Sequence, residues 1–153
     1  MLNQKETKRL VLLLKKIDKP HEGLPQLVFD ALTKIVPFVA CELVIAEKEG
    51  VLLTWREDKW WKGWHFPGGL LRFQESFKER IEQVAWKEFG VNVSSFKFLF
   101  AKDCSHSKRG CGVSLVFLCK TAMAPNRGKF FKKMPKNIIG DHRELWMMVK
   151  KII

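Results

Sequence analysis

The sequence of 153 residues lacks tyrosine, closely spaced cysteine pairs and long apolar runs. None of its four cysteines forms a C-x-x-C pair, which excludes the strongest zinc-binding signature. The apolar run at 11–14 is short and two lysines follow it, so we find no signal peptide and nothing near the ~20 apolar residues that span a membrane. We therefore expect a chain of the reducing cytoplasm with no membrane partner. Cys104, His106 and Cys111 lie close together in sequence, but an ordinary reduced loop is a simpler interpretation than a metal loop.

Acidic residues are fewer than basic ones, and the difference varies along the chain. Lys and Arg number 28 against 16 Asp and Glu, a formal net charge of +12. The segment 1–19 carries six basic and two acidic residues, and 120–153 carries nine and two, whereas the chain between them is nearly balanced. Such an excess indicates an anionic partner (nucleic acid, a phosphorylated ligand or a membrane surface) or two solvated faces.

Hydrophobic periodicity divides the chain into helices and strands. The 3.6-residue pattern predicts helices over 5–17, 25–34, 76–89 and 143–153. Apolar segments rich in β-branched residues predict strands over 38–45, 51–55, 91–93, 96–101 and 113–119, the first two joined in a hairpin by a turn at 47–50. Loops are expected over 56–69, 102–112 and 124–140. This order is that of an α/β fold, with 1–24 as an N-terminal helical extension and 25–153 as a single domain.

The most informative stretch is 64–75, WHFPGGLLRFQE, which runs into the helix 76–89 and ends at Gly90. Its Pro-Gly-Gly sequence at 67–69 predicts a tight turn that leaves backbone groups exposed beside a helix start. Such a turn supplies oxygen ligands to a hard cation or N–H donors to a phosphate. Gly90 is the residue type that a left-handed cap requires where the helix ends.

This stretch resembles the signature of the Nudix hydrolase superfamily. The matching positions are Gly69, Glu75, Glu88, Gly90 and Val91, whereas Gln83, Val84 and Lys87 stand where the family has Arg, Glu and Glu. The resemblance implies an α/β/α sandwich with a mixed β-sheet. It also implies a Mg²⁺-dependent hydrolase, with Mn²⁺ as the alternative metal, that acts on a nucleoside diphosphate linked to another moiety.

The replacements change what the helix offers. At 100° per residue, positions 84, 87 and 88 share one face, so Glu88 is the only carboxylate of the three that remains there. Lys87 opposes metal binding, although an ammonium also holds a phosphate. The far side of the helix carries Glu75, Glu79 and Glu82, which we interpret as a solvated acidic stripe.

A similar loss of glutamates is found in one branch of the superfamily, the GDP-mannose mannosyl hydrolases. The resemblance to that branch includes an acid, Glu42, in the first strand, and it implies a nucleotide sugar as substrate and an N-terminal segment that contributes to a homodimer. The site residues that it implies are the carbonyl of Gly68 or Gly69 and Glu88 for the metal, and Asp141, His142 and Glu88 for catalysis.

The two C-terminal site candidates also have a structural interpretation. A histidine such as His142 titrates near neutral pH and suits a general base. Asp141, however, is also a suitable N-cap, and Glu144 three residues later would complete a capping box. His65 and His106 are weaker candidates for the base, because each lies in an expected loop with no partner visible in the sequence.

Cationic and aromatic side chains around the turn are candidates for substrate binding, namely Arg56, Lys59, Arg72, Lys87 and Trp64. The cations would clamp a diphosphate. Trp64, with Trp60 and Trp61, would either stack on a nucleobase or fill the core. The basic segment 124–140 is typical of a nucleic-acid contact, a lid over the pocket or a solvated loop.

Two functions of different class follow from these residues. The first is the hydrolase. The alternative is a catalytically impaired module that binds a nucleotide or RNA without cleaving it, as Val84 and Lys87 favour. A purely oligomeric role for the N-terminal helix is a third class. We prefer a phosphorylated small molecule to nucleic acid as the partner, because the basic excess at 120–153 borders the expected site.

Overall fold

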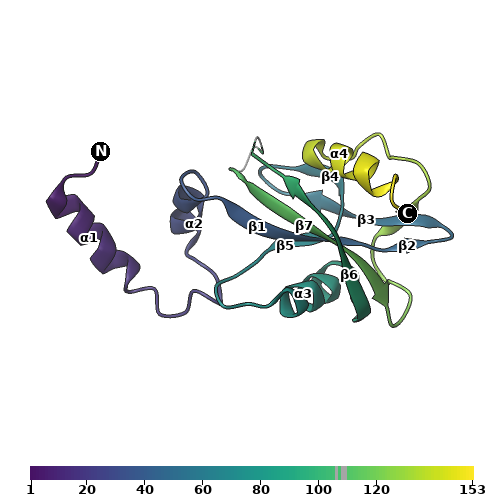
Figure 1. Ribbon diagram of the computed structural model, residues 1–153, viewed down its shortest axis with the longest axis horizontal. Coiled ribbons are helices and arrows are strands. Elements are labelled where there is room, and N and C mark those ends of the chain that lie inside the picture. The colour runs from purple at the N-terminus through teal and green to yellow at the C-terminus, as the bar shows by residue number, and fades with distance from the viewer. Residues whose placement is uncertain (106, 108–109) are drawn as a thin grey trace.

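Helices lie on both faces of a β-structure in the computed structural model, which describes residues 1–105, 107 and 110–153 (Figure 1). The helices are α1 (Gln4–Leu14), α2 (Gln26–Leu32), α3 (Phe77–Phe89) and α4 (Gly140–Val149). The strands are β1 (Phe38–Val44), β2 (Ala46–Glu47), β3 (Gly50–Glu57), β4 (Lys62–His65), β5 (Gly68–Leu70), β6 (Val93–Asp103), β7 (Gly112–Thr121) and β8 (Lys129–Phe131). This is the α/β/α sandwich that the resemblance implies.

The main sheet is mixed, as expected. Its strand order is β5-β1-β7-β6, in which β1 and β7 are parallel while the outer pairs are antiparallel. A second, antiparallel sheet has the order β2-β3-β4, with β8 paired to β3. The short strand β5 therefore lies at the edge of the main sheet, next to the start of α3 (Figure 1).

The core has two layers, one on each side of the strands. On one side, Leu43 of β1 packs in a buried cluster with Ile81 and Phe89 of α3. On the other, Val44 shares a cluster with Trp146 of α4. Because successive side chains of a strand point to opposite faces, β1 contributes to both layers, which explains its almost continuous apolar sequence.

Helix α3 begins and ends where the sequence predicts. The Ser76 side chain accepts a hydrogen bond from the Glu79 amide, and the Glu79 carboxylate accepts one from the Ser76 amide, so a capping box closes the N-terminus. Gly90 ends the helix in a left-handed conformation with φ of 70°. A Cβ at Gly90 would also collide with Asn126, so two independent constraints require glycine there.

The predicted hairpin is wrong in its partners. Strand β1 does not pair with β3 and lies in the centre of the main sheet. Of the chain before the predicted turn, only the two residues of β2 form a ladder with β3. Since β1 is buried on both faces, its backbone N–H and C=O groups need a hydrogen-bonded strand along each edge, and those strands are β5 and β7. The predicted strands at 91–93 and 96–101 are one strand, β6, with register shifts along it.

Two predicted loops contain strands. The segment 56–69 includes the end of β3, all of β4 and the start of β5, and 124–140 includes β8. These strands are short and rich in Gly, Trp or Lys, so they carry little periodicity. They form because each pairs with an existing partner strand.

Helix α4 starts earlier than predicted, which corrects the capping assignment. The N-cap position is Ile139, so Asp141 lies in the first turn and is not the cap of a box with Glu144. Ile138 and Ile139 are buried and fix the chain directly before the helix. None of the helices in the described ranges is long and apolar enough to cross a bilayer.

Candidate functional site

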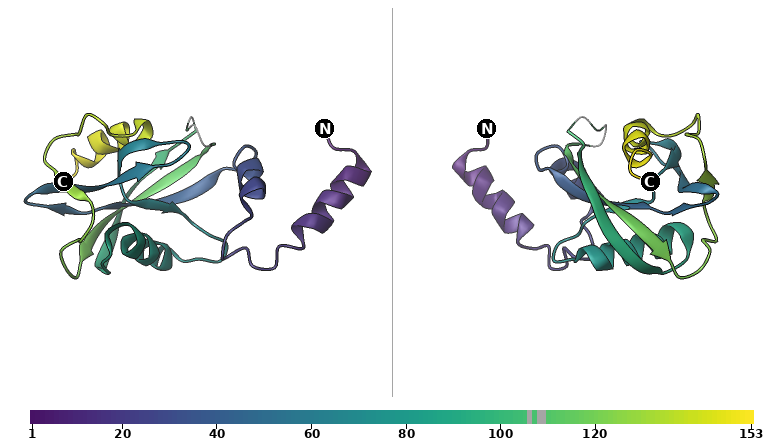
Figure 2. Two further views of the ribbon diagram at one scale, coloured as in Figure 1. Left: turned by 180° about the vertical axis from the view of Figure 1, so that it is seen from behind. Right: turned by 45° about the vertical axis from the view of Figure 1, so that its right-hand side comes forward.

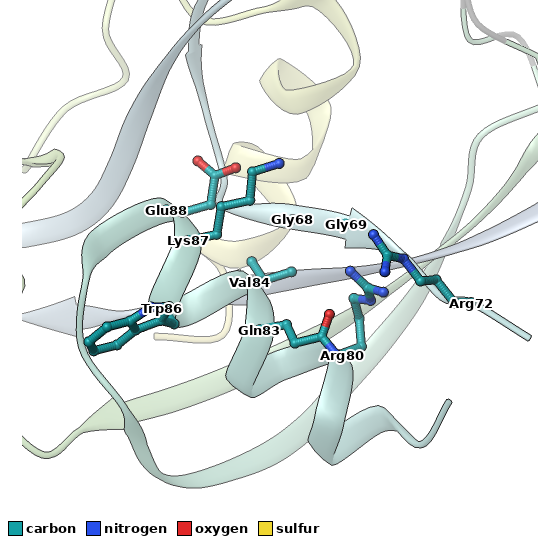
Figure 3. A pocket seen from close by; sticks show the side chains of 9 residues that line it. All are labelled: Gly68, Gly69, Arg72, Arg80, Gln83, Val84, Trp86, Lys87 and Glu88. Atoms are coloured by element: carbon teal, nitrogen blue, oxygen red, sulfur yellow. The ribbon is translucent and has the colours of Figure 1, made fainter. Parts of the chain in front are cut away.

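A cavity of about 300 Å³ lies between α3 and β5, at the position that the 64–91 motif predicts. Its lining residues are Gly68, Gly69, Arg72, Arg80, Gln83, Val84, Trp86, Lys87 and Glu88. Figure 3 shows that the cavity has two chemically different ends, with Lys87 and Glu88 at one and the guanidinium groups of Arg72 and Arg80 at the other. Val84 lies between them. The structure thus gathers five of the predicted site residues: Gly68, Gly69, Arg72, Lys87 and Glu88.

The two glycines have different backbone roles. The bonds from the Leu43 amide to the Pro67 carbonyl and from the Leu71 amide to the Val39 carbonyl fix the β5–β1 ladder. In an antiparallel ladder the peptide groups of alternate residues point outwards. The register therefore turns the carbonyl of Gly68 away from β1 and that of Gly69 towards it. Since β5 is the sheet edge, Gly68 is the residue with a carbonyl free for a ligand.

Side chains also require glycine at these positions. A Cβ at Gly68 would collide with the Glu42 carboxylate of β1. A Cβ at Gly69 would lie 2.9 Å from Cγ2 of Val84, which would push α3 off the sheet edge. The close approach of α3 to Gly69 forms one wall of the cavity, whereas Glu42 approaches Gly68 and is not among the lining residues.

Glu88 is held by a short polar chain from the neighbouring sheet. The Thr54 hydroxyl donates to Oε2 of Glu88 at 3.0 Å, and Nε2 of His65 lies 3.1 Å from the same hydroxyl. A hydroxyl has one proton, so while Thr54 donates to Glu88 its oxygen accepts from the His65 ring. Burial lowers the pKa of His65, against the opposing effect of the Glu88 charge. Glu88 is therefore an oriented carboxylate.

Glu42 supplies a second carboxyl group beside Gly68. Its residue is 8% exposed, and its Oε2 has no hydrogen-bond partner among the described residues. Burial, followed by the nearby Glu88 charge, raises the pKa of Glu42 to about 8, although Arg56 opposes the shift. Glu42 is therefore largely protonated at neutral pH, and a cation bound beside it would favour its ionised form.

These groups fit a hard divalent cation. Glu42, Glu88 and the outward carbonyl of Gly68 are all oxygen donors, the ligand class that Mg²⁺ and Mn²⁺ prefer. No group of three or more His, Cys, Asp or Glu side chains in the described part of the chain is arranged to hold a metal. A site here thus depends on two carboxylates and a backbone oxygen, with water completing the shell. His106, part of the suggested metal loop with Cys104 and Cys111, lies outside the described residues.

The interpretation of Glu75, Glu79 and Glu82 as a solvated stripe is wrong for Glu75. Glu75 is not solvated, because its carboxylate accepts from Nε and Nη2 of Arg80 and from the Arg72 amide, and its side chain is only 7% exposed. The bidentate pair fixes the 71–76 segment against α3. It also neutralises Arg80, which leaves Arg72 and Lys87 as the less buried cations of the cavity.

The C-terminal candidates lie beside this cluster and do not line the cavity. Nδ1 of His142 accepts a hydrogen bond of 3.0 Å from the Phe66 amide, so the neutral ring carries its proton on Nε2. Burial, together with the His65 and Arg56 charges, lowers the pKa of His142 to about 3. In this geometry the imidazole offers a donor. Asp141 is half-buried in the first turn of α4 and acts electrostatically on Lys102.

The remaining substrate-binding candidates lie outside the cavity lining. Arg56 pairs with Asp58 at 2.6 Å, yet its charge reaches Glu42 and both site histidines. Lys59 pairs with Asp30 of α2 at 3.1 Å. The Trp64 ring packs edge-on against Phe131 at 4.9 Å and against the core, which is the core-filling alternative considered above.

The sequence prediction assigned neither Glu42 nor Thr54 to the site. Both interrupt apolar strand segments, FVACELV in β1 and VLLTW in β3. A single polar side chain within a buried strand must find a partner, because leaving it unpaired is costly. That signal was present in the sequence.

Sequence comparisons give limited information. No family model matches the chain. A segment of 78 residues is 37% identical to the low-salt glycan biosynthesis protein Agl8 of Haloferax volcanii. That match covers 50% of this chain and 50% of Agl8, so the chain spans about half the length of this relative.

Structural comparisons are extensive. The MutT Nudix hydrolase of Burkholderia pseudomallei superposes with a TM-score of 0.61 at 19% identity, over 74% of this chain and 98% of that one. The Nudix domain of Shewanella oneidensis NrtR, complexed with ADP ribose, gives 0.59 at 17% identity over 84% and 98%. A bifunctional NMN adenylyltransferase/ADP ribose pyrophosphatase of Francisella tularensis, complexed with AMP and a Mn ion, gives 0.56 at 18% over 75% and 41%. The chain therefore has the Nudix fold.

Proposed function

We propose that this chain is a metal-dependent hydrolase of a nucleoside diphosphate linked to another moiety, with a nucleotide sugar as the substrate class. One observation carries the proposal: the buried Glu42 carboxyl against Gly68 interacts electrostatically with the oriented Glu88 carboxylate, next to a cavity that also presents Arg72 and Lys87. Hydrolysis of a diphosphate needs carboxylates that hold a metal ion and, next to them, basic side chains that bind the phosphate groups.

Mg²⁺, or Mn²⁺ in its place, would be held by Glu88, Glu42 and the Gly68 carbonyl. When bound, it supplies positive charge that stabilises the diphosphate as its bond breaks. Thr54 and His65 keep the Glu88 carboxylate in one orientation. The bond that breaks, at phosphorus or at the sugar carbon, is left open by these residues.

The cationic groups divide the work of binding. Lys87 lies next to Glu88, close to the proposed metal, and binds a phosphate as a point charge (Figure 3). Arg72 lies at the far end and reaches a second anionic group. Asp141 and His142 remain our candidates for the C-terminal catalytic function, with His142 acting as a donor from Nε2 in the geometry described.

The comparisons support this proposal by analogy. One structural neighbour carries ADP ribose and another carries AMP and Mn, and the sequence relative belongs to glycan biosynthesis. Glycan assembly uses sugars activated on phosphate groups, which favours a nucleotide sugar over other diphosphates. Each of these facts concerns the other protein and motivates the choice of substrates below.

Replacing Glu88 tests the proposal. With Mg²⁺ and either ADP-ribose or GDP-mannose, we expect Glu88→Gln to lower turnover by at least about 100-fold, because a carboxylate ligand becomes a neutral amide. Glu82→Gln is the matched control on the same helix, since Glu82 pairs with Lys78 on the surface and is not among the residues that line the cavity. Product release is followed by chromatography. Turnover that persists in Glu88→Gln would contradict the assignment.

A specific observation also favours the alternative, a module that binds nucleotide or RNA without cleaving it. Val84 and Lys87 occupy two of the three positions on the helix face, and Val84 is buried among apolar side chains. A thermal-shift series with ADP-ribose, GDP-mannose and an RNA oligonucleotide separates the two functions. Stabilisation that is independent of Mg²⁺, with no product formed, would identify the module.

A further inference from the structure

Helix α1 presents two unlike surfaces, and the proposed function uses neither. Its apolar face consists of Leu10, Leu13 and Leu14, which recur at helical spacing with exposures of 44%, 53% and 39%. Lys5, Lys8 and Arg9 lie on the opposite and flanking sides of the helix, where Leu12 is also exposed, and Lys15 and Lys16 directly follow its last residue. We call Leu10, Leu13 and Leu14 the α1 apolar face and these basic residues the α1 basic face.

Helix α1 is capped by its own residues and makes no contribution to the core. Asn3 accepts from the Glu6 amide and the Glu6 carboxylate accepts from the Asn3 amide, so a capping box closes its N-terminus. None of its residues is buried. All views show it projecting from the domain beyond α2, on the 15–25 connection (Figure 2). The fold therefore does not cover the α1 apolar face.

We propose that α1 docks on an anionic lipid bilayer, lying in the plane of the interface. An amphipathic helix with Lys and Arg opposite a leucine face binds there, with the apolar face among the acyl chains and the cations at the headgroups. Long lysine side chains reach the headgroup level from either flank of such a helix. This assigns a partner to the basic excess of 1–19, which the cavity leaves unused.

Charge argues against the other occupants. In a helix pair formed with a second copy through the apolar faces, the α1 basic face would point outwards on each helix, and the pairing would leave its charge without an anionic partner. A nucleic acid would match the α1 basic face and leave the apolar face in water. The expectation of no membrane partner followed from the missing spanning segment, which an interfacial helix does not require.

Vesicle co-sedimentation of the full chain tests the proposal. With vesicles of phosphatidylcholine and roughly one-third phosphatidylserine, we expect at least about tenfold more bound protein than with phosphatidylcholine alone, falling with salt. Leu10→Ser with Leu13→Ser should reduce binding by about tenfold or more. Lys132→Glu with Lys133→Glu, two exposed lysines outside α1, is the charge-matched control for Lys8→Glu with Lys15→Glu.

The outcomes are decisive in both directions. Loss of binding in the leucine pair and in the α1 charge pair, but not in the control pair, supports the proposal. No binding to anionic vesicles at low salt overturns it. Binding that survives the leucine changes overturns it as purely electrostatic, and a dimer that these changes convert to monomer assigns the face to a second copy. Unchanged thermal unfolding and turnover confirm that the variants keep the domain intact.

Discussion

Helices α1 and α3 begin alike and end up in opposite situations. Each has a capping box at its N-terminus, Asn3 with Glu6 and Ser76 with Glu79, and each has apolar residues at helical spacing. Helix α3 buries five of its residues against the sheet, whereas α1 buries none. Local chemistry therefore makes the helix, and only the partner surface decides whether the helix stabilises the fold.

The same difference separates their charges. Two charged residues of α3 at the cavity are held in place, Arg80 by Glu75 and Glu88 by Thr54. The basic side chains of α1 point into solvent around one acid. One helix is thus part of a chemical site, and the other is a surface available to a partner.

The largest difference between α1 and α3 is expected when one apolar side chain in each helix is replaced by alanine. Phe89 is fully buried, so Phe89→Ala should lower the free energy of unfolding by about 4 kcal/mol. Leu13→Ala should change it by less than about 0.5 kcal/mol, because that side chain is exposed in both states. Urea denaturation measures both. A large loss in Leu13→Ala would show that α1 packs on the domain in solution.

The second test uses pH on the buried cluster beside α3. The folded pKa of Glu42 is about 8 against an ordinary value of 4.5, so between those values the folded chain keeps a proton that the unfolded chain releases. Stability contributed by this group therefore falls as pH rises through that range. Glu42→Gln removes the dependence. We expect it to be about 3 kcal/mol more stable than the original chain at pH 8 and similar at about pH 5.

That comparison is made by urea denaturation in chelator, since a bound cation would offset the cost of ionising Glu42. Glu6→Gln on α1 is the control, because it removes a carboxyl from the exposed helix. Parallel pH profiles for Glu42→Gln and the original chain would be inconsistent with the buried carboxyl described above.

The smallest expected effect comes from removing the N-terminal cap of each helix, Ser76 of α3 and Asn3 of α1. Ser76→Ala should cost about 1 kcal/mol of global stability, because the cap belongs to a helix that the core requires. Asn3→Ala removes the same kind of bond from α1 and should leave the urea midpoint unchanged while it lowers helical circular dichroism slightly. Equal midpoint shifts would mean that the two helices unfold together.

Much of the fold was predictable because local signals and burial agree. Helix α3 was located to within a residue at either end, from its apolar periodicity and from Gly90. Where the prediction failed, the deciding interaction was distant in sequence. The strands β4, β5 and β8 exist through pairing with β3 or β1, and the centre of the sheet joins β1 to β7 across most of the domain.

The site was predicted where the motif is continuous in the chain and missed where it is assembled in space. Gly68, Gly69, Lys87 and Glu88 lie together as expected. Glu42 comes from another strand, and its role depends on packing against Gly68, which no local pattern encodes. The Glu75–Arg80 pair was missed for a different reason, since a carboxylate at a helix start has the same sequence appearance whether it is solvated or paired.

The parallel pairing of β1 with β7 has a kinetic consequence. The pairing of Phe38 with Gly112 closes a long loop. Such loops form slowly, because the chain loses conformational entropy before the contacts between the strands stabilise it. Glu42 lies on β1, so it takes its place beside Gly68 and Glu88 only with the sheet that this closure completes. A capped helix such as α1 forms within microseconds. The nascent chain therefore presents its basic, leucine-rich N-terminal helix well before the cavity and the Glu42 carboxyl are in place.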